Sequence, residues 1–481
     1  MMASYDYDLV CIGSGPAGQR AAVQAAKVGK RVAVVEKQRF VGGICVDNGT
    51  IPSKTFREAV RRVYSRPGLE VMDPFSTSGR SRPTMQQLVG HVHRVIQREI
   101  AVVDDALTRN DVKILHARGE FVDPHTIRLE AEGERRVITA DKVLIAVGTR
   151  PGEPRGMTPD GRTVITSDDV LGIEELPQTM AVVGAGVIGI EYASMFAALG
   201  VRVTVIDARE RPLEFMDYEI VDELMHQLRK ADVTFRWGDA VEQVEIVETP
   251  KRQGLLKLHS GKFLVADVIL VSAGRQGASS TLNLEAVGLE ADERGRLHVD
   301  ENFRTPVENI WAAGDLIGFP ALAAMSSEQG RLAACRMFGV DAEPIGHHYP
   351  IGIYAIPELS SVGATEEELT SQKVPYETGV ARYKEISRGI ILGDDSGMFK
   401  MLFHRDDGRL LGCHCIGSGA TELVHVGQAV LGLGGGLDYF LKTVFNYPTL
   451  AECYKTAAFH AANKLALISQ AKTFIDGNGS T

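Results

Sequence analysis

Gly13-Ser14-Gly15-Pro16-Ala17-Gly18 is the stretch that decides the fold, and Gly184-Ala185-Gly186-Val187-Ile188-Gly189 repeats its glycine pattern. Each copy follows a short apolar run, residues 7–12 or 180–183, and leads into a segment with helical character that ends at a glycine. In such a unit of strand, turn and helix, the first glycine permits a tight turn and the second lets the backbone approach a pyrophosphate. The N-terminus of the helix offers unpaired N–H groups to that anion. The repeat therefore predicts two dinucleotide-binding units.

An acidic residue closes each unit. A strand over 31–35 ends at Glu36, and after a helix predicted over 191–199 a strand over 202–206 ends at Asp207. A carboxylate at this place accepts hydrogen bonds from an adenosine ribose. Each half of the chain also ends in a similar strand and glycine phrase, at Gly148 and Gly274, which indicates repeated domain architecture.

The fold class expected from this order is α/β, with two Rossmann-like domains and a C-terminal α+β domain. The first domain would comprise residues 1–152 and 279–346, and the second, residues 153–278, would be inserted into it near Pro151. In residues 347–481, apolar strands over 399–403 and 410–416 alternate with helices over 422–433 and 450–467, without a nucleotide pattern. The polar end, residues 471–481, is expected to fray.

Composition excludes several function classes. The chain has 481 residues and a formal net charge of −10, whereas a nucleic-acid partner would need clustered Lys and Arg. The start of the sequence is acidic, with neither a basic segment nor a cleavable apolar one, which favours the cytoplasm. The long apolar stretch at 180–206 contains Glu191, Arg202 and four glycines, so no membrane span is expected.

The six cysteines do not form the framework of a secreted protein. Cys413-His414-Cys415 suggests a metal site, but alternation along a strand places both thiols on one face, and no second ligand pair is spaced nearby. No metal site is therefore predicted.

A loop after the first unit carries Gly42-Gly43-Ile44-Cys45 and then Thr50-Ile51-Pro52-Ser53-Lys54. With the two glycine turns, Glu191, Ala313-Gly314-Asp315, Tyr447-Pro448-Thr449 and Glu452, it makes an ordered set that closely resembles the flavoprotein family with two dinucleotide-binding domains, which includes dihydrolipoamide dehydrogenase and glutathione reductase. The resemblance implies FAD in the first domain, NAD(P)H in the second and a homodimer formed through the C-terminal domain. It leaves larger assemblies open.

The motifs that match those of the family imply two sets of binding residues in this chain. FAD would contact Gly13, Gly15, Pro16, Ala17, Gly18, Glu36, Lys37, Gly42, Gly43, Ile44, Cys45, Thr50, Lys54, Gly119, Gly148, Gly314 and Asp315. NAD(P) would contact Gly184, Gly186, Val187, Ile188, Gly189, Glu191, Asp207, Arg209, Gly274 and Arg275.

Two departures from that family concern its dithiol chemistry. Disulfide reductases carry a second cysteine where this loop has Thr50, and a hydroxyl cannot exchange with a disulfide near neutral pH. Tyr447 stands where the family has an acid/base histidine, and a phenol with a pKa of about 10 is a poor proton shuttle at pH 7. Glu452, which would orient that histidine, lacks its partner.

Because both nucleotide sites are kept, the flavin is the one redox centre left. The stretches 49–54 and 445–449 are similar to those of the transhydrogenase branch of this family. The expected function is FAD-dependent, ping-pong hydride transfer between NADPH and NAD⁺. Lys54 would stabilise negative charge on the reduced flavin, and Glu191 would pair with it and touch the nicotinamide, although a buried structural ion pair explains these two residues as well.

Asp207 favours NAD(H), because a carboxylate accepts from a 2′-hydroxyl and repels a 2′-phosphate. Arg209 or Arg211 could meet that phosphate, or both could be solvated. Three other functions stay open: an NAD(P)H-dependent quinone reductase or oxidase, a monothiol enzyme using Cys45, and a flavin-holding subunit without activity. A yellow protein that NADPH bleaches without oxygen, and that NAD⁺ recolours, would favour hydride exchange.

Overall fold

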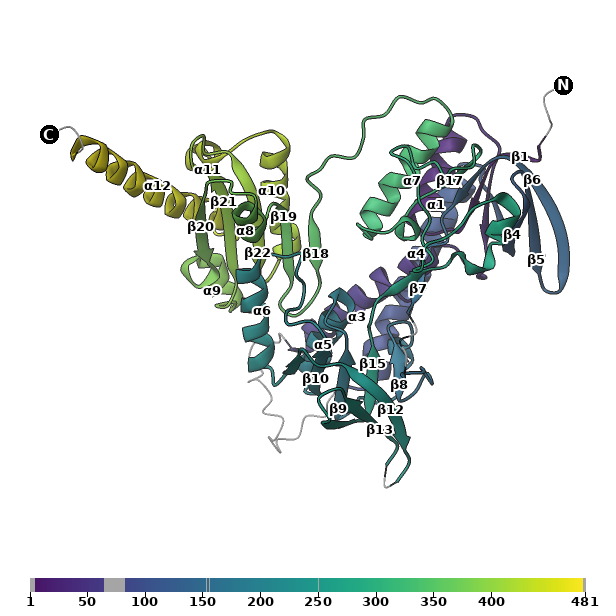
Figure 1. Cartoon of the computed structure of the whole chain (residues 1–481), viewed down its shortest axis with the longest axis horizontal. Coiled ribbons are helices and arrows are strands. Elements are labelled where there is room, and N and C mark those ends of the chain that lie inside the picture. Colours follow the sequence, from purple (N-terminus) through teal and green to yellow (C-terminus); the bar gives the residue numbers. More distant parts are fainter. Residues whose placement is uncertain (1–4, 65–82, 153, 155, 250, 479–481) are drawn as a thin grey trace.

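The structure is a computed structural model that describes residues 5–64, 83–152, 154, 156–249 and 251–478 (Figure 1). Its first unit is a seven-stranded sheet with the order β3-β2-β1-β6-β5-β4, and β17 pairs with β6. β1 runs parallel to β2 and to the second half of β6, whereas β5 pairs antiparallel with the first half of β6. The strands are β1 (Tyr7–Ile12), β2 (Val32–Glu36), β3 (Lys113–His116), β4 (Arg118–Asp123), β5 (Thr126–Ala131), β6 (Glu134–Ile145) and β17 (Ile310–Ala312).

Helices from distant parts of the sequence cover this sheet. α1 and α7 approach so closely that a Cβ at Gly330 would lie 2.0 Å from the carbonyl oxygen of Ala17. The small side chains of Ala21, Ala22 and Ala25 are fully buried, which lets α1 pack tightly. The helices are α1 (Pro16–Lys27), α2 (Gly43–Asp47), α3 (Thr50–Tyr64), α4 (Met85–Thr108) and α7 (Ala323–Met337).

The second unit repeats this plan with a parallel sheet of order β11-β10-β9-β15-β8. Its helix α5 begins at Val187, four residues before the predicted start at Glu191, because the glycine turn leads directly into helical backbone. The elements are β8 (Val164–Thr166), β9 (Thr179–Val183), α5 (Val187–Ala198), β10 (Arg202–Asp207), α6 (Tyr218–Lys230), β11 (Thr234–Trp237), β15 (Val268–Val271) and an antiparallel sheet of β12 (Val241–Val247), β13 (Gln253–Leu258) and β14 (Phe263–Ala266).

The chain passes between these units through a small antiparallel ribbon of β7 (Thr149–Pro151) and β16 (Arg275–Gly277). Arg275 holds the ribbon together, since its Nε donates to Thr149 Oγ1 at 2.8 Å and its Nη2 to the Thr149 carbonyl at 3.1 Å. Short 3₁₀ turns complete the connections: Val170–Gly172, Ser279–Thr281, Leu284–Val287, Asp315–Ile317 and Tyr383–Glu385.

After α7 an extended segment leads to the C-terminal unit (Figure 1). This unit is an antiparallel sheet of order β18-β19-β22-β21-β20, with Phe399, Phe440 and Tyr454 buried in its core. The elements are β18 (Ile351–Ile353), β19 (Leu359–Gly363), α8 (Glu366–Ser371), β20 (Tyr376–Arg382), α9 (Ser387–Leu392), β21 (Met398–His404), β22 (Leu410–Ile416), α10 (Ala420–Gly432), α11 (Leu437–Lys442) and α12 (Glu452–Asn478).

The prediction that residues 471–481 fray is wrong for 471–478, which continue α12; residues 479–481 lie outside the described part. This helix contains no proline and one glycine, so little in its sequence stops it earlier. Cys413 and Cys415 share one buried cluster, while His414 bonds Ser361 and the Ala364 carbonyl. Within the described ranges, no group of three or more His, Cys, Asp or Glu side chains is arranged to hold a metal ion, and no helix is long and apolar enough to cross a bilayer.

A buried lysine joins the second and C-terminal units. Lys400 in β21 is 1% exposed, and its Nζ lies 3.0 Å from Asp217 and 3.1 Å from Glu219, both at the start of α6. Glu366 of α8 completes the cluster. Burial alone would lower the pKa of Lys400, but the surrounding carboxylates, Asp217 first, raise it, so the lysine is charged.

Candidate functional site

The first glycine turn leaves an open place at the start of α1. A Cβ at Gly13 would lie 2.3 Å from the Ala146 carbonyl oxygen, and one at Gly18 would lie 1.9 Å from that of Gly13, so packing explains both glycines. A Cβ at Gly15 would meet nothing within 4 Å, and no side chain caps the helix that follows it. The free N–H groups of α1 therefore face space that an anion can fill.

The loop with Gly42 and Gly43 lies against that turn. Gly43 has φ of +60°, and a Cβ on it would come within 2.9 Å of the Gly15 Cα. The amide of Gly42 donates to Ser14 Oγ at 2.9 Å, and Ser14 Oγ donates to Glu36 Oε2 at 2.6 Å. One hydrogen-bonded chain thus holds the loop, the glycine turn and the acidic residue at the end of β2 together.

Glu36 keeps an accepting position for a ligand. Its Oε2 accepts from the amide and the hydroxyl of Ser14, while its Oε1 accepts, among the residues that the structure describes, from the Gln38 amide alone, at 2.9 Å. A carboxylate has about four lone-pair positions, so one on Oε1 stays available to a ribose hydroxyl. Together with the open place at Gly15, this shows that the residues present fit a dinucleotide such as FAD.

The other residues predicted to bind FAD have different environments. Asp315 follows Gly314 and accepts from Ser326 Oγ at 3.1 Å, which orients its carboxylate at the start of α7. A Cβ at Gly119 in β4 would lie 3.1 Å from Val35 Cγ1, so packing explains that glycine without a ligand. Lys37 is exposed, Ile44 is half-buried in α2, Pro16 and Ala17 form the first turn of α1, and Gly148 has a positive φ with open space beside it.

The second glycine turn has the same construction. Cβ atoms at Gly184 and Gly189 would lie 2.6 Å from the Ser272 carbonyl oxygen and 2.0 Å from the Gly184 carbonyl oxygen, whereas one at Gly186 would meet nothing within 4 Å. α5 also begins without a side-chain cap, at Val187 and Ile188. Gly274 has φ of +103° and open space beside it. A second anion can therefore bind here.

Asp207, at the end of β10, differs from Glu36 because its carboxylate is fully occupied. Oδ1 accepts from the Arg209 amide at 2.9 Å and from its Nε at 3.0 Å. Oδ2 accepts from the Ala185 amide at 2.6 Å and from Arg209 Nη2 at 2.7 Å. Burial alone would raise the pKa of Asp207, but these hydrogen bonds lower it. The carboxylate therefore stays charged and is neutralised by Arg209.

The structure gives Arg209, Arg211 and Arg275 different surroundings, and it distinguishes the first two, between which the sequence left the choice open. Arg209 is 46% exposed beside Asp207. Arg211 instead pairs with Asp222 at 2.9 Å and lies over the ring of Tyr218, 4.3 Å from its centroid. Arg275 is bound to Thr149 in the crossing ribbon. Of these three, Arg209 is the one placed at the acidic residue that closes the second unit.

Lys54 and Glu191 meet although 137 residues separate them. Lys54 lies in the first turns of α3 and Glu191 in α5, and their ion pair measures 2.7 Å. The glutamate side chain is 4% exposed and the lysine 25% exposed, so the carboxylate is the buried partner and the ammonium is the one open to a ligand. The pair therefore stands where the two dinucleotide-binding units face each other.

Sequence reasoning did not identify the third side of this site. The amide of Tyr354 donates to Glu191 Oε1 at 2.8 Å, and the Tyr354 ring centroid lies 5.0 Å from Lys54 Nζ. The neighbouring Arg57 pairs with Glu358 at 2.8 Å. The sequence marks this place only by the segment 352–358, whose glycine, aromatic and acidic residues indicate no role by themselves.

Cys45 has a hydroxyl, not a thiol, as its neighbour across the loop. Burial raises the pKa of the Cys45 thiol, and a hydrogen bond with Thr50 only partly offsets that rise. A thiol with a raised pKa is a poor nucleophile at neutral pH. All six cysteines are free, and five of them are buried.

Tyr447 lies far from Lys54 in the sequence and is 66% exposed. Its hydroxyl is 2.7 Å from Ser387 Oγ. Glu452 Oε2 is buried and has no hydrogen-bond partner among the described residues, as expected of a carboxylate that has lost a histidine. The two residues are therefore not arranged as an acid/base pair within one chain.

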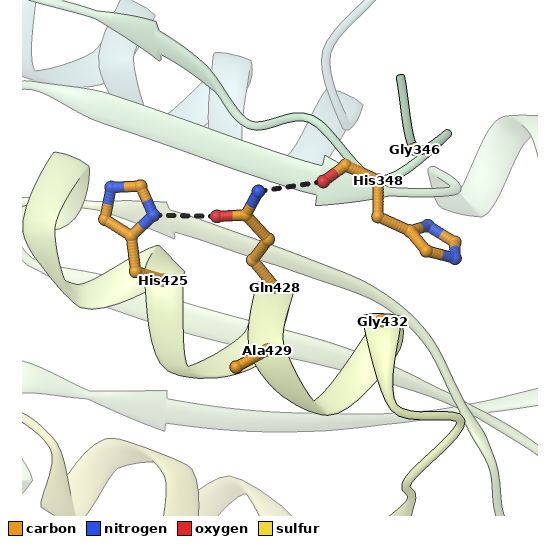
Figure 2. A pocket seen from close by; sticks show the side chains of 6 residues that line it. All are labelled: Gly346, His348, His425, Gln428, Ala429 and Gly432. Carbon is orange, nitrogen blue, oxygen red and sulfur yellow. Dashed lines mark hydrogen bonds between the residues drawn. The ribbon is translucent and has the colours of Figure 1, made fainter. Parts of the chain in front are cut away.

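A separate pocket of about 510 Å³ lies between α10 and the segment before β18 (Figure 2). Gln428 Oε1 accepts from His425 Nδ1 at 2.8 Å, and Gln428 Nε2 donates to the His348 carbonyl at 2.9 Å, while the His348 ring points away from both. None of the residues predicted for nucleotide binding or catalysis lines it.

Comparisons with known proteins agree with this geometry. Residues 7–330 match the family described as pyridine nucleotide-disulphide oxidoreductase, and residues 349–458 match its dimerisation domain. The soluble pyridine nucleotide transhydrogenase of Mycobacterium tuberculosis is 50% identical over 469 residues, which cover 97% of this chain and 99% of that protein. The soluble pyridine nucleotide transhydrogenase of a Marinomonas species is 42% identical, with coverage of 96% and 100%.

Solved structures give the same family. The HOCl-induced flavoprotein disulfide reductase from Escherichia coli superimposes with a TM-score of 0.85 at 26% identity, covering 94% of this chain and 99% of that one. That enzyme is named a disulfide reductase, whereas Cys45 here faces Thr50.

Proposed function

Since the chain belongs to the pyridine nucleotide-disulphide oxidoreductase family, we propose that it transfers hydride between NADPH and NAD⁺, with FAD as its cofactor. The observation that carries this proposal is the pairing of Cys45 with Thr50 beside an intact Lys54–Glu191 pair. The chain keeps the residues expected to bind both nucleotides, whereas the loop that would exchange disulfides lacks its second thiol. Relatives aligned over almost their full length are named transhydrogenases.

FAD, when bound, supplies the hydride chemistry by accepting a hydride from one nicotinamide and returning it to another. The chain supplies position and charge. The uncapped starts of α1 and α5 bind the two pyrophosphates through backbone N–H groups and the positive ends of the helices. Glu36 accepts from the ribose at its remaining free position on Oε1.

Lys54 presents a positive charge to the site. Its partner Glu191 is the more buried of the two and is held by the Tyr354 amide, so the carboxylate anchors the ammonium from behind. This arrangement orients the Lys54 ammonium without using it as a proton donor. We assign Lys54 and Glu191 the catalytic roles, and the two sets of residues named above the binding of FAD and NAD(P).

We also assign residues 1–152 and 279–346 to FAD binding, residues 153–278 to NAD(P) binding and residues 347–481 to dimerisation. The crossing ribbon of β7 and β16 and the match of residues 349–458 to a dimerisation domain support this division. The assembly would be a homodimer in the cytoplasm, where both nucleotide pools are present, and Tyr447 would face the flavin of the other subunit.

The test is anaerobic mixing of the purified yellow protein with NADPH, followed by thio-NAD⁺. Bleaching at the first step and recovery of colour with formation of thio-NADH at the second would support the proposal. A quinone offered together with thio-NAD⁺ provides the competing acceptor. If the quinone takes most of the electrons, the protein is a quinone reductase of the same fold, and if NADPH bleaches nothing, both proposals fail.

A further inference from the structure

A short segment of the C-terminal unit docks on both helices that carry the catalytic pair. This segment, residues 354–358, connects β18 to β19. On the α5 side, the amide of Tyr354 donates to Glu191 Oε1 at 2.8 Å, and the amide of Ile356 donates to Ser194 Oγ at 3.0 Å. The C-terminal unit therefore contacts the hydride-transfer site directly.

A buried ion pair holds the other side of the segment on α3. Arg57 Nε donates to the Ala355 carbonyl at 2.9 Å, and its Nη2 lies 2.8 Å from Glu358. The two side chains are 4% and 5% exposed. Removing one partner of such a pair leaves an uncompensated buried charge, so the ion pair resists separation. One turn after Lys54, α3 is thus fastened to the segment that also holds Glu191.

The Tyr354 ring occupies the space between these contacts. Its centroid lies 5.0 Å from Lys54 Nζ and 5.9 Å from the Arg57 guanidinium carbon. Its hydroxyl is hydrogen-bonded to Thr421 at the start of α10. At the same end of the ring, a Cβ at Gly352 would lie 3.4 Å from Tyr354 Cε2. The ring is therefore held at its hydroxyl end, and it presents its face to the ammonium of Lys54.

We propose that Tyr354 is a positioning residue for hydride transfer, with its ring holding the Lys54 ammonium in place from the C-terminal unit. A cation within about 6 Å of a ring centroid is attracted by the negative face of the ring. Glu191 fixes one side of the ammonium and Tyr354 another, so the direction in which Lys54 presents its charge is set by three units at once. The inference rests on the proposed function, because it assigns Tyr354 to the same site.

Substitutions separate the ring from the backbone contact. Tyr354→Leu keeps the backbone amide that donates to Glu191 and much of the apolar side-chain volume, but it removes the face of the aromatic ring. Tyr354→Phe keeps the face and loses the bond to Thr421. The matched control is Tyr376→Leu, because Tyr376 is another half-buried tyrosine of this unit whose hydroxyl contacts Thr370 and Glu366 rather than the catalytic pair.

The experiment measures anaerobic bleaching of the FAD-loaded variants by NADPH in a stopped-flow instrument, and the flavin midpoint potential by dye titration. Tyr354→Leu should slow bleaching at least tenfold with a twofold change or less in the NADPH dissociation constant. Its potential should fall, because a less well-placed cation stabilises negative charge less. A tenfold change in the reduction equilibrium corresponds to about 30 mV for two electrons. Tyr354→Phe should stay within threefold of the unmodified protein, and Tyr376→Leu within twofold.

A Tyr354→Leu protein that retains FAD and matches the unmodified protein in bleaching rate and potential would overturn the inference. Equal losses in Tyr354→Phe and Tyr354→Leu would also overturn it, because the ring face would then not matter. If Tyr354→Leu does not fold, Ser194→Ala, which removes the acceptor of the Ile356 amide, should slow bleaching about threefold, and an unchanged rate would contradict the role of the segment. Failure of thio-NAD⁺ to restore colour in the unmodified protein would refute the proposed function alone, since bleaching still reports on Tyr354.

Discussion

Arg209 closes on Asp207 through two parallel hydrogen bonds, from Nε to Oδ1 at 3.0 Å and from Nη2 to Oδ2 at 2.7 Å. With the amides of Ala185 and Arg209, all four accepting positions of this carboxylate are taken. A ribose 2′-hydroxyl finds an acceptor here only when Arg209 turns away. A 2′-phosphate would instead meet the exposed edge of the Arg209 guanidinium. The negative charge of Asp207 is already neutralised by that same arginine. We therefore propose that this pair of residues serves both nucleotides.

Arg209→Ala should shift the preference toward NAD(H). The carboxylate of Asp207 would then be free to accept from the ribose and would repel a 2′-phosphate, so kcat/KM for NADPH should fall at least tenfold while that for NADH is unchanged or higher. Competition by 2′,5′-ADP and by 5′-AMP, measured with a dye as electron acceptor, tests the subsite without relying on hydride exchange.

Arg211→Ala is the matched control, because Arg211 is engaged with Asp222 and Tyr218. Its ratio of NADPH to NADH efficiency should stay within twofold of the unmodified protein. A larger shift in Arg211→Ala than in Arg209→Ala would show that the wrong arginine had been assigned.

Cys45→Ser should leave hydride exchange within threefold of the unmodified protein. The thiol has a raised pKa and no second thiol beside it, so no electron has to pass through sulfur. Exchange of NADPH for thio-NAD⁺ before and after alkylation provides the measurement. Loss of exchange in a Cys45→Ser protein with full FAD occupancy would refute the proposed route.

Lys54→Met and Glu191→Gln should both slow bleaching by NADPH, but for different reasons. Lys54→Met removes the positive charge and leaves Glu191 buried without its partner, so it should also lower the thermal unfolding midpoint. Glu191→Gln keeps an acceptor for the Tyr354 amide and frees the ammonium, so its unfolding midpoint should change less. We expect a tenfold loss or more in each rate. Rates equal to that of the unmodified protein would reduce the pair to a structural role.

Asp267 should contribute to the loss of stability in acid. Burial alone would raise its pKa, but hydrogen bonds from Gln253, Lys251 and the amides of Gln178 and Thr179 outweigh burial and lower the pKa to about 2. A carboxyl group with a lowered folded pKa stabilises the fold above its unfolded pKa of about 3.9, and that contribution is lost as the pH falls toward 2.

The difference of about two units corresponds to on the order of 2 kcal/mol. Asp267→Asn should therefore lower the unfolding midpoint at pH 6, and the gap to the unmodified protein should narrow by pH 3. If the difference between the two unfolding midpoints stays constant from pH 6 to pH 3, the charge of the Asp267 carboxylate does not stabilise the fold.

Local chemistry explains why much of the fold could be predicted. Tyr7–Ile12 was expected as a strand and is one, because apolar residues bounded by a glycine turn leave few alternatives. The expected strands leading to Glu36 and Asp207 are also present, as β2 and β10. The meeting of Lys54 with Glu191 was expected only from the resemblance to a family, since no local pattern joins residues 137 positions apart.

Contacts between units could not be predicted from the sequence. Tyr354 contacts Lys54 only when the C-terminal unit packs against the other two. The sequence of residues 352–358 does not indicate which helices that segment will contact. The choice between Arg209 and Arg211 also stayed open, because it depends on side-chain conformations and on the position of Asp222 in α6. The start of α5 was predicted four residues too late, because residues 187–189 belong both to the glycine pattern and to the first turn of the helix.

The fully enclosed Lys400 restricts how the molecule can move. Pulling the start of α6 away from β21 would separate the buried Lys400 from Asp217 and Glu219 and would leave it with Glu366 of α8 as its partner. The ion pairs of Lys400 with Asp217 and Glu219 therefore oppose separation of the second unit from the C-terminal unit. We expect these two units to keep their relative orientation while one nicotinamide replaces the next, so that the replacement proceeds through local displacement of side chains and loops.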